Sequence, residues 1–208
     1  LFASSVKNDF IGANASQFLY GEAISISSDG NRIAIGAPDY DNGTGSTLGA
    51  VFIYDKDPSV TGARPIGWKE TIIEGDSSYS EFGMSVDLSY DGNYLVVGAI
   101  YAGSGQVYTY YWNGTSWENN NNTNKTPFTL SGPSIITGAE LGYNVKFRHG
   151  NASATISNSI LLTTEVSNSA APFAINMYYI DSNYDWSEFG LNDPYSTPPL
   201  KFWKTPSS

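Results

Sequence analysis

Cysteine is absent from the 208-residue chain, and histidine occurs once, at His149. The lack of cysteine excludes disulfides, thiol chemistry and cysteine-ligated metals. A single histidine, in a stretch that reads as a strand end, argues against a multi-histidine metal site and against a Ser-His-Asp triad. The chain also lacks a Gly-x-Ser-x-Gly elbow and a phosphate-binding glycine loop. The familiar enzyme motifs are therefore missing.

Positive charge and long apolar runs are scarce as well. Ten Lys and Arg stand against 20 Asp and Glu, which gives a formal net charge of −10. Because phosphate contacts need a clustered basic surface, we predict no nucleic-acid partner. No run of 18 apolar residues occurs, so we also predict no membrane span.

What the chain does contain is typical of β-structure with polar, uncharged surfaces. Aromatic residues make up 14 % of the sequence, including 15 Tyr, and charged residues make up only 14 %. Ser, Thr, Asn and Gly are abundant, which suits tight turns.

The chain also contains a repeat. Residues 18–37 align without a gap on residues 80–99, 62 positions further on. The matched anchors are Gly21 with Gly83, Asp29-Gly30-Asn31 with Asp91-Gly92-Asn93, and Gly36-Ala37 with Gly98-Ala99. Self-similarity at a fixed offset indicates a repeat architecture.

Apolar residues alternate with period two within each repeat, which predicts four short strands per unit. The first unit is predicted to have strands at Ala23 to Ile26, Ile33 to Ala37, Ala50 to Tyr54 and Trp68 to Ile73. The second has Met84 to Ser89, Tyr94 to Ala99, Gln106 to Tyr110 and a fourth strand that ends at Phe128 to Gly132. A degenerate third has Glu140 to Val145, Ile160 to Thr164, Ala174 to Tyr179 and Trp186 to Glu188.

These units resemble the FG-GAP repeats of integrin-α-like β-propellers. The resemblance rests on Glu81 to Val86, Gly36-Ala37-Pro38, Gly98-Ala99, Gly49 to Tyr54 and Gly105 to Tyr110. It implies an all-β, propeller-like array of about three four-stranded antiparallel blades plus an orphan N-terminal strand. The expected divisions are 1–17 (last strand of a preceding blade), 18–79, 80–138, 139–193 (the degenerate blade) and 194–208 (a Pro-rich tail). The glycines are expected where neighbouring blades approach closely, although each could instead serve a local turn.

Blades of that family often carry a Ca²⁺ loop of the form Asp-x-Asp/Asn-x-Asp-Gly between their first two strands. The corresponding turns here hold one acid each, Asp29 and Asp91, and we interpret both as turn formers, since Ca²⁺ needs six to eight oxygens. Asp39 and Asp41 are better candidates for a Ca²⁺ site, although acidic-Gly loops are commonly simple turns. No other cofactor is expected.

Two kinds of site relate to carbohydrate. Asn-x-Ser/Thr sequons, which are glycan acceptors in secreted chains, occur at Asn14, Asn42, Asn113, Asn121, Asn124 and Asn151. They indicate a secreted protein at an extracellular or particle surface. Trp112 and Trp117 are candidates for stacking on a bound glycan, with core packing or a turn as the alternative roles.

The hypothesis is therefore a non-catalytic extracellular module for adhesion or for surface or filament assembly. The alternative is a carbohydrate-binding or carbohydrate-active propeller protein that uses a carboxylate pair. Closed propellers have four to eight blades, so three blades predict a longer propeller or self-assembly with other subunits. We expect open blade edges, the strand within residues 1–12 or the Pro-rich tail to make the contact.

Overall fold

All regular structure in the described part of the chain is β-strand. The computed structural model describes residues 18–61, 66–78, 80–103, 105–119, 139–147, 160–167, 174–180 and 186–188. These ranges contain no helix. A helical membrane span is accordingly not found among them.

The strands form three four-stranded antiparallel sheets, and each sheet comes from one repeat. Sheet 1 contains β1 (Ile24–Ile26), β2 (Arg32–Ala37), β3 (Ala50–Lys56) and β4 (Trp68–Glu74) in that order. Sheet 2 contains β5 (Phe82–Leu88), β6 (Tyr94–Ala99), β7 (Gln106–Trp112) and β8 (Trp117–Asn119). Sheet 3 contains β9 (Ala139–Phe147), β10 (Ile160–Ser167), β11 (Ala174–Ile180) and β12 (Trp186–Glu188). The predicted all-β class and the four-stranded antiparallel sheets are confirmed. The degenerate third repeat also forms such a sheet.

The turns between the first two strands of sheets 1 and 2 are built alike. Asp29 accepts a hydrogen bond from the Ser27 hydroxyl (2.6 Å) and another from the backbone N–H of Asn31 (3.0 Å). Gly30, between Asp29 and Asn31, has a positive φ, a backbone conformation that is unfavourable for residues with a Cβ. The second turn repeats these bonds at the same distances with Ser89, Asp91 and Asn93. The interpretation of Asp29 and Asp91 as turn formers is therefore confirmed.

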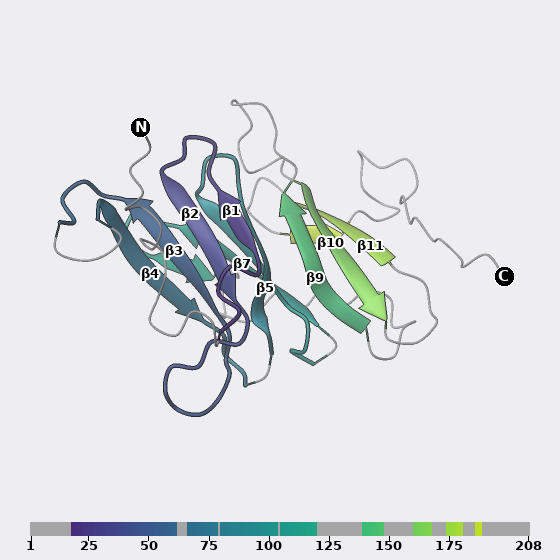
Figure 1. Cartoon of the computed structure of the whole chain (residues 1–208). Coiled ribbons are helices and arrows are strands. Elements are labelled where there is room, and N and C mark those ends of the chain that lie inside the picture. The colour runs from purple at the N-terminus through teal and green to yellow at the C-terminus, as the bar shows by residue number, and fades with distance from the viewer. Residues whose placement is uncertain are drawn as a thin grey trace, which may run out of the picture.

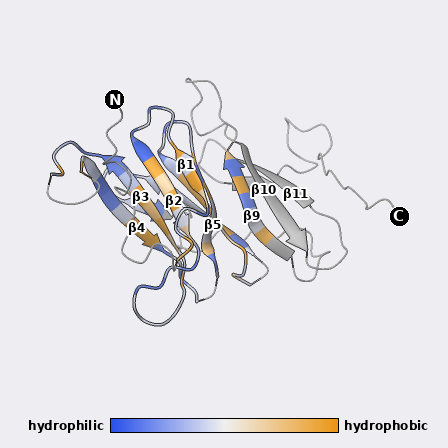
Figure 2. Ribbon diagram, viewed as in Figure 1, coloured by the Kyte–Doolittle hydropathy of each residue, from blue (hydrophilic) through white to orange (hydrophobic). Residues whose placement is uncertain are grey.

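The sheets lie side by side in chain order, with sheet 2 between the other two (Figure 1). We call the face of a sheet toward the preceding repeat its leading face, and the opposite face its trailing face. The trailing face of sheet 1, with Ala34, Val51 and Ile53, packs on the leading face of sheet 2, with Val86 and Leu88. The trailing face of sheet 2 packs on the leading face of sheet 3 through Val96, Val107, Leu141, Val145 and Phe147. Figure 2 shows hydrophobic residues along strands of sheet 1 and along β9.

Paired glycines bring the sheets into backbone contact. A Cβ added at Gly36 would lie 2.0 Å from the carbonyl oxygen of Gly83, and one at Gly98 would lie 1.9 Å from that of Gly142. Real Cβ atoms do not approach other heavy atoms so closely. The expected close approach is confirmed at these positions, and a role in local turns alone does not explain them.

The first strands of the three sheets are also neighbours, and equivalent residues join them. The Ser25 hydroxyl donates to Asp87 Oδ1 (2.8 Å), and Lys146 Nζ forms an ion pair with the same oxygen (3.3 Å). The backbone N–H of Phe147 donates to Asp87 Oδ2 (2.8 Å). The carboxylate of Asp87 is buried, and through these three interactions it connects all three repeats.

The fourth strand of sheet 2 is β8 (Trp117–Asn119), which pairs with Tyr110 to Trp112 of β7. The strand end predicted at Phe128 to Gly132 lies outside the described residues and stays a prediction. The chain reverses immediately after Trp112 because Gly114 has a φ of 98° and the Asn113 side chain accepts backbone N–H groups of the turn. An Asn-Gly pair is a strong hairpin signal, and it was present in the sequence.

Candidate functional site

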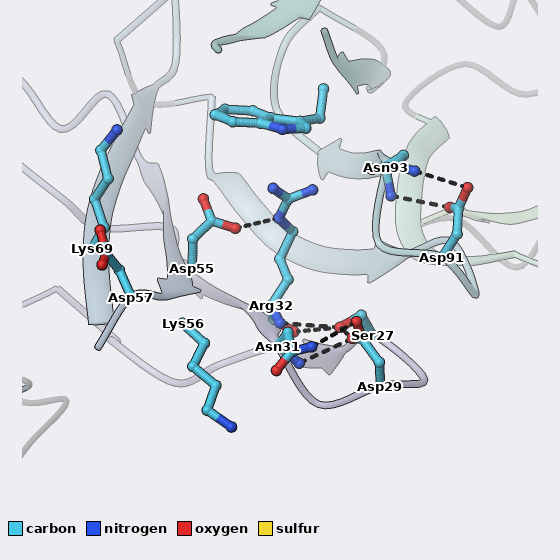
Figure 3. A pocket seen from close by; sticks show the side chains of 11 residues that line it. Ser27, Asp29, Asn31, Arg32, Asp55, Lys56, Asp57, Lys69, Asp91 and Asn93 are labelled. Atoms are coloured by element: carbon cyan, nitrogen blue, oxygen red, sulfur yellow. Dashed lines mark hydrogen bonds and ion pairs between the residues drawn. The ribbon is translucent and has the colours of Figure 1, made fainter. Parts of the chain in front are cut away.

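A cleft of about 380 Å³ opens between sheets 1 and 2, beside the two Asp-Gly-Asn turns (Figure 3). Its lining is polar and carries both signs of charge. The acids are Asp29, Asp55, Asp57 and Asp91, and the bases are Arg32, Lys56 and Lys69. Trp112 completes one wall.

Arg32 crosses the joint between the sheets. Its guanidinium forms an ion pair with Asp55 in its own sheet, and its Nη1 donates to the carbonyl oxygen of Gly92 (2.7 Å) in the turn of sheet 2. Its Cζ also lies 4.8 Å from the ring centroids of both Trp112 and Trp117. A cation over an indole face is attracted by the ring quadrupole. Arg32 therefore clamps sheet 1 to sheet 2.

The carboxylates of the cleft are engaged with their neighbours. Hydrogen bonds, first from the Ser27 hydroxyl and then from Asn31, lower the pKa of Asp29 to about 2. Hydrogen bonds from the hydroxyl and backbone N–H of Ser59 lower the pKa of Asp57 as well. A carboxylate that accepts several hydrogen bonds is stabilised in its charged form. The geometry thus assigns these acids to turns and to the sheet–sheet joint.

A second feature is the leading face of sheet 1, which no described segment covers along β1. Ile24 and Ile26 are 61 % and 57 % exposed. The residues 62 positions later, Val86 and Leu88, are 2 % and 0 % exposed because sheet 1 covers them. Along its first strand this face is therefore buried in one repeat and open in the other, whereas Ile35, Phe52 and Tyr54 on the same face of sheet 1 are buried.

The aromatic residues at this face repeat as well. Tyr20 packs edge-on against Phe52 (5.1 Å between centroids), as Phe82 packs against Tyr108 (5.1 Å) in sheet 2. Tyr20 also shares a hydrogen bond of 2.9 Å with Tyr54. Burial raises the pKa of Tyr20 to about 12, so its hydroxyl is neutral at physiological pH. The leading face of sheet 1 thus has the same aromatic arrangement that sheet 2 has where it packs against sheet 1.

The two calcium candidates lie in the loop between β2 and β3. Asp41 Oδ1 accepts the backbone N–H groups of Gly43 (2.8 Å) and Gly45 (3.2 Å), as in a simple Asx-type turn. The backbone N–H of Asp39 donates to the carbonyl of Phe18. Within the described ranges, no group of three or more His, Cys, Asp or Glu side chains is placed to hold a metal ion. The calcium site stays a prediction.

Two sequons lie in described turns and are exposed. Asn42 Oδ1 accepts the N–H of Thr44 (3.3 Å), and Asn113 Oδ1 accepts that of Thr115 (2.8 Å), so both adopt the same local geometry. Asn14, Asn121, Asn124 and Asn151 lie outside the described residues, as do His149 and both terminal segments. Occupancy of the sequons stays a prediction.

The two candidate stacking residues are brought together by the β7–β8 hairpin. The rings of Trp112 and Trp117 are 5.7 Å apart and tilted by 54°, and Arg32 lies against both. They do not form a flat platform in this arrangement. The carbohydrate-binding alternative stays a prediction.

Sequence reasoning missed Arg32 and the open face at Ile24 and Ile26. Arg32 aligns with Tyr94 in the repeat, and this difference between a cationic and an aromatic residue was the sequence feature that could have indicated a special role for Arg32. For the isoleucines the sequence holds no signal, since they are as apolar as their buried counterparts.

The chain matches no protein-family model. A search of curated proteins also finds no match.

Proposed function

We propose that this chain is a non-catalytic, propeller-type repeat module of an extracellular surface, and that it works by assembling with other protein subunits. One observation carries the proposal. Ile24 and Ile26 are more than half exposed, whereas the equivalent residues of the next repeat are buried by a neighbouring sheet. The FG-GAP resemblance supports the same class of architecture, in which every blade face is covered by another blade.

The exposed side chains of β1 would be covered by a further sheet of this repeat type, and we propose that a second copy of the chain supplies it. A joint between repeats buries apolar side chains from both sheets, as Val86 and Leu88 show. Burying an isoleucine fully contributes about 1.5–3 kcal/mol, so burying the exposed part of both side chains contributes about 2–3.5 kcal/mol. This corresponds to about a 100-fold change in the dissociation constant.

The extracellular location rests on the sequons. Asn42 and Asn113 lie at exposed turns on two different sheets, where their side chains are accessible for glycan attachment. The net charge of −10 favours solubility of the free subunit. Together they suit a protein that is secreted before it assembles.

Sedimentation velocity over a concentration series tests the proposal. We expect Ile24→Asp to weaken self-association of the full chain about 100-fold, because it places a charge in the joint. Ile66→Asp is the matched control, since Ile66 is also 61 % exposed but lies in the loop before β4. Equal association of the two variants and the wild type would refute the proposal.

A further inference from the structure

The tripeptide Asn-Gly-Thr occurs at Asn42 and again at Asn113, and both copies lie in exposed turns. In each copy the glycine has a positive φ, 92° at Gly43 and 98° at Gly114. Each asparagine also donates a hydrogen bond from Nδ2 to the carboxylate of a glutamate on a strand. Sequence, backbone conformation and this contact are shared. A difference in reactivity between the two sites must therefore come from their other contacts.

An Asn-Gly pair holds two groups that can react with each other. The side-chain carbon Cγ of the asparagine is an electrophile, and the next backbone nitrogen is a nucleophile that glycine leaves unshielded because it has no Cβ. An asparagine whose Oδ1 accepts the N–H two residues later is folded over the peptide in between, so its Cγ lies beside that nitrogen. Both sites have this arrangement, with Thr44 as the donor to Asn42 (3.3 Å) and Thr115 as the donor to Asn113 (2.8 Å). Proximity of this kind accelerates an intramolecular reaction.

The turn at Asn113 has further contacts that favour the reaction. Attack on Cγ places negative charge on Oδ1, and preorganised N–H donors stabilise such an oxyanion. Asn113 Oδ1 accepts two N–H groups, from Thr115 and from Ser116 (2.9 Å). Asn42 Oδ1 accepts one, from Thr44, among the described residues. The Ser116 hydroxyl also lies 3.1 Å from Asn113 Nδ2, within reach of the nitrogen that would depart.

The attacking nitrogens differ as well. The N–H of Gly43 donates to Asp41 Oδ1 (2.8 Å). This carboxylate stabilises the N–H and opposes the negative charge that the nitrogen gains as it loses its proton. The N–H of Gly114 has no such acceptor within the described ranges. The contacts on the nucleophile and on Oδ1 thus both favour reaction at Asn113 over reaction at Asn42.

We propose that Asn113 is a self-modification site, which converts to aspartate and isoaspartate in the folded chain. The nitrogen of Gly114 bonds to Asn113 Cγ, the Cγ–Nδ2 bond breaks, and Nδ2 leaves as ammonia with the proton that the Gly114 nitrogen gives up. Water then opens the five-membered ring, which gives aspartate if the new bond is cleaved and isoaspartate if the bond to the backbone carbonyl carbon is cleaved. The product carboxylate faces Glu118 without the amide N–H that Glu118 accepts now. The modification therefore acts on the β7–β8 hairpin, and it is independent of the assembly proposed above.

The two tripeptides within one chain provide a matched comparison. The chain is produced in a host that attaches no N-glycans and is incubated in mildly alkaline buffer, and peptide mapping by mass spectrometry follows both asparagines in the same sample. We expect Asn113 to convert about 10-fold faster than Asn42 in the folded chain, which is less than the roughly 100-fold that one donor contributes in a water-excluded enzyme site. In concentrated urea the turns are lost, and we expect similar rates at the two sites. Equal rates in the folded chain, a faster Asn42, or a ratio that persists in urea would overturn the proposal.

A pair of variants tests the role of the N–H donors. Ser116→Pro removes one donor to Asn113 Oδ1, whereas Ser116→Ala keeps that donor; both lack the hydroxyl and keep the tripeptide. We expect Ser116→Pro to convert Asn113 several-fold more slowly than Ser116→Ala, with Asn42 as the internal reference in each. The same Asn113 rate in both variants would refute stabilisation by the turn. Near-UV circular dichroism checks folding, and if Ser116→Pro loses the hairpin, the wild-type comparison between buffer and urea decides the question.

Discussion

Replacing Gly98 by alanine tests whether backbone contact between sheets stabilises the fold. Gly98 lies in β6 and faces Gly142 of β9. The added Cβ would lie 1.9 Å from the Gly142 carbonyl oxygen and 2.4 Å from the Ser85 hydroxyl. Contact distances for such atoms exceed 3 Å, so sheets 2 and 3 would have to separate by about 1 Å.

The magnitude follows from what that separation disturbs. Overpacking in a close-packed interior costs about 1–3 kcal/mol. The hydrogen bond from the Ser85 hydroxyl to the Gly142 carbonyl, 2.6 Å long, is lost and costs about 1 kcal/mol. Alanine also stabilises the protein by about 0.4–1 kcal/mol, because it lowers the conformational entropy of the unfolded chain. We expect the free energy of unfolding to fall by about 2 kcal/mol.

Urea unfolding followed by tryptophan fluorescence measures this change. With a urea dependence of about 1–3 kcal/mol per molar, the midpoint should fall by about 1 M. Gly114→Ala is the control, because Gly114 has a φ of 98° and nothing within 4 Å of its added Cβ. Its cost of about 1 kcal/mol comes from the backbone alone. If Gly98→Ala costs less than Gly114→Ala, the close-approach argument is refuted.

Three further predictions concern the clamp, the turn and the sequons. Arg32→Met should lower the free energy of unfolding by about 2 kcal/mol, because it removes the ion pair and the contacts with Trp112 and Trp117; urea unfolding that matches the wild type would contradict this. The pKa of Asp29, about 2 in the folded state against 3.8 in the unfolded state, implies stability that is present above pH 4 and lost as the pH falls toward 2. The difference in stability between the wild type and Asp29→Asn should therefore shrink over that range, and an unchanged difference would count against the turn network. In protein secreted from a eukaryotic cell, Asn42→Gln should lower the intact mass by one glycan, and an identical mass before and after deglycosylation would contradict occupancy.

Strands and hairpin turns could be predicted from the sequence because their determinants are local. Alternating apolar residues suit a half-buried strand, and Asp-Gly-Asn suits a tight reversal. Even in the third repeat, which has lost its Asp-Gly turn, the second strand predicted at Ile160 to Thr164 is confirmed by β10. The turn expected beside Trp112 is likewise local, since Asn113 and Gly114 form it.

The pairings across the joints could not be predicted in this way. Trp112 and Trp117 looked like a ligand platform because nothing in their own repeat places Arg32 against them. Nothing in the sequence of its own repeat places the carboxylate of Asp87 between Ser25 and Phe147. These contacts join residues 60 to 85 positions apart, and their geometry depends on how whole sheets pack.

The sequence by itself determined the repeat, its strands and the equivalence of Ile24 with Val86. Only the tertiary structure decided that one of these two residues is covered and the other open. The physical reason is that alternation assigns a residue to a face of its sheet, whereas burial of that face depends on the sheet packed against it.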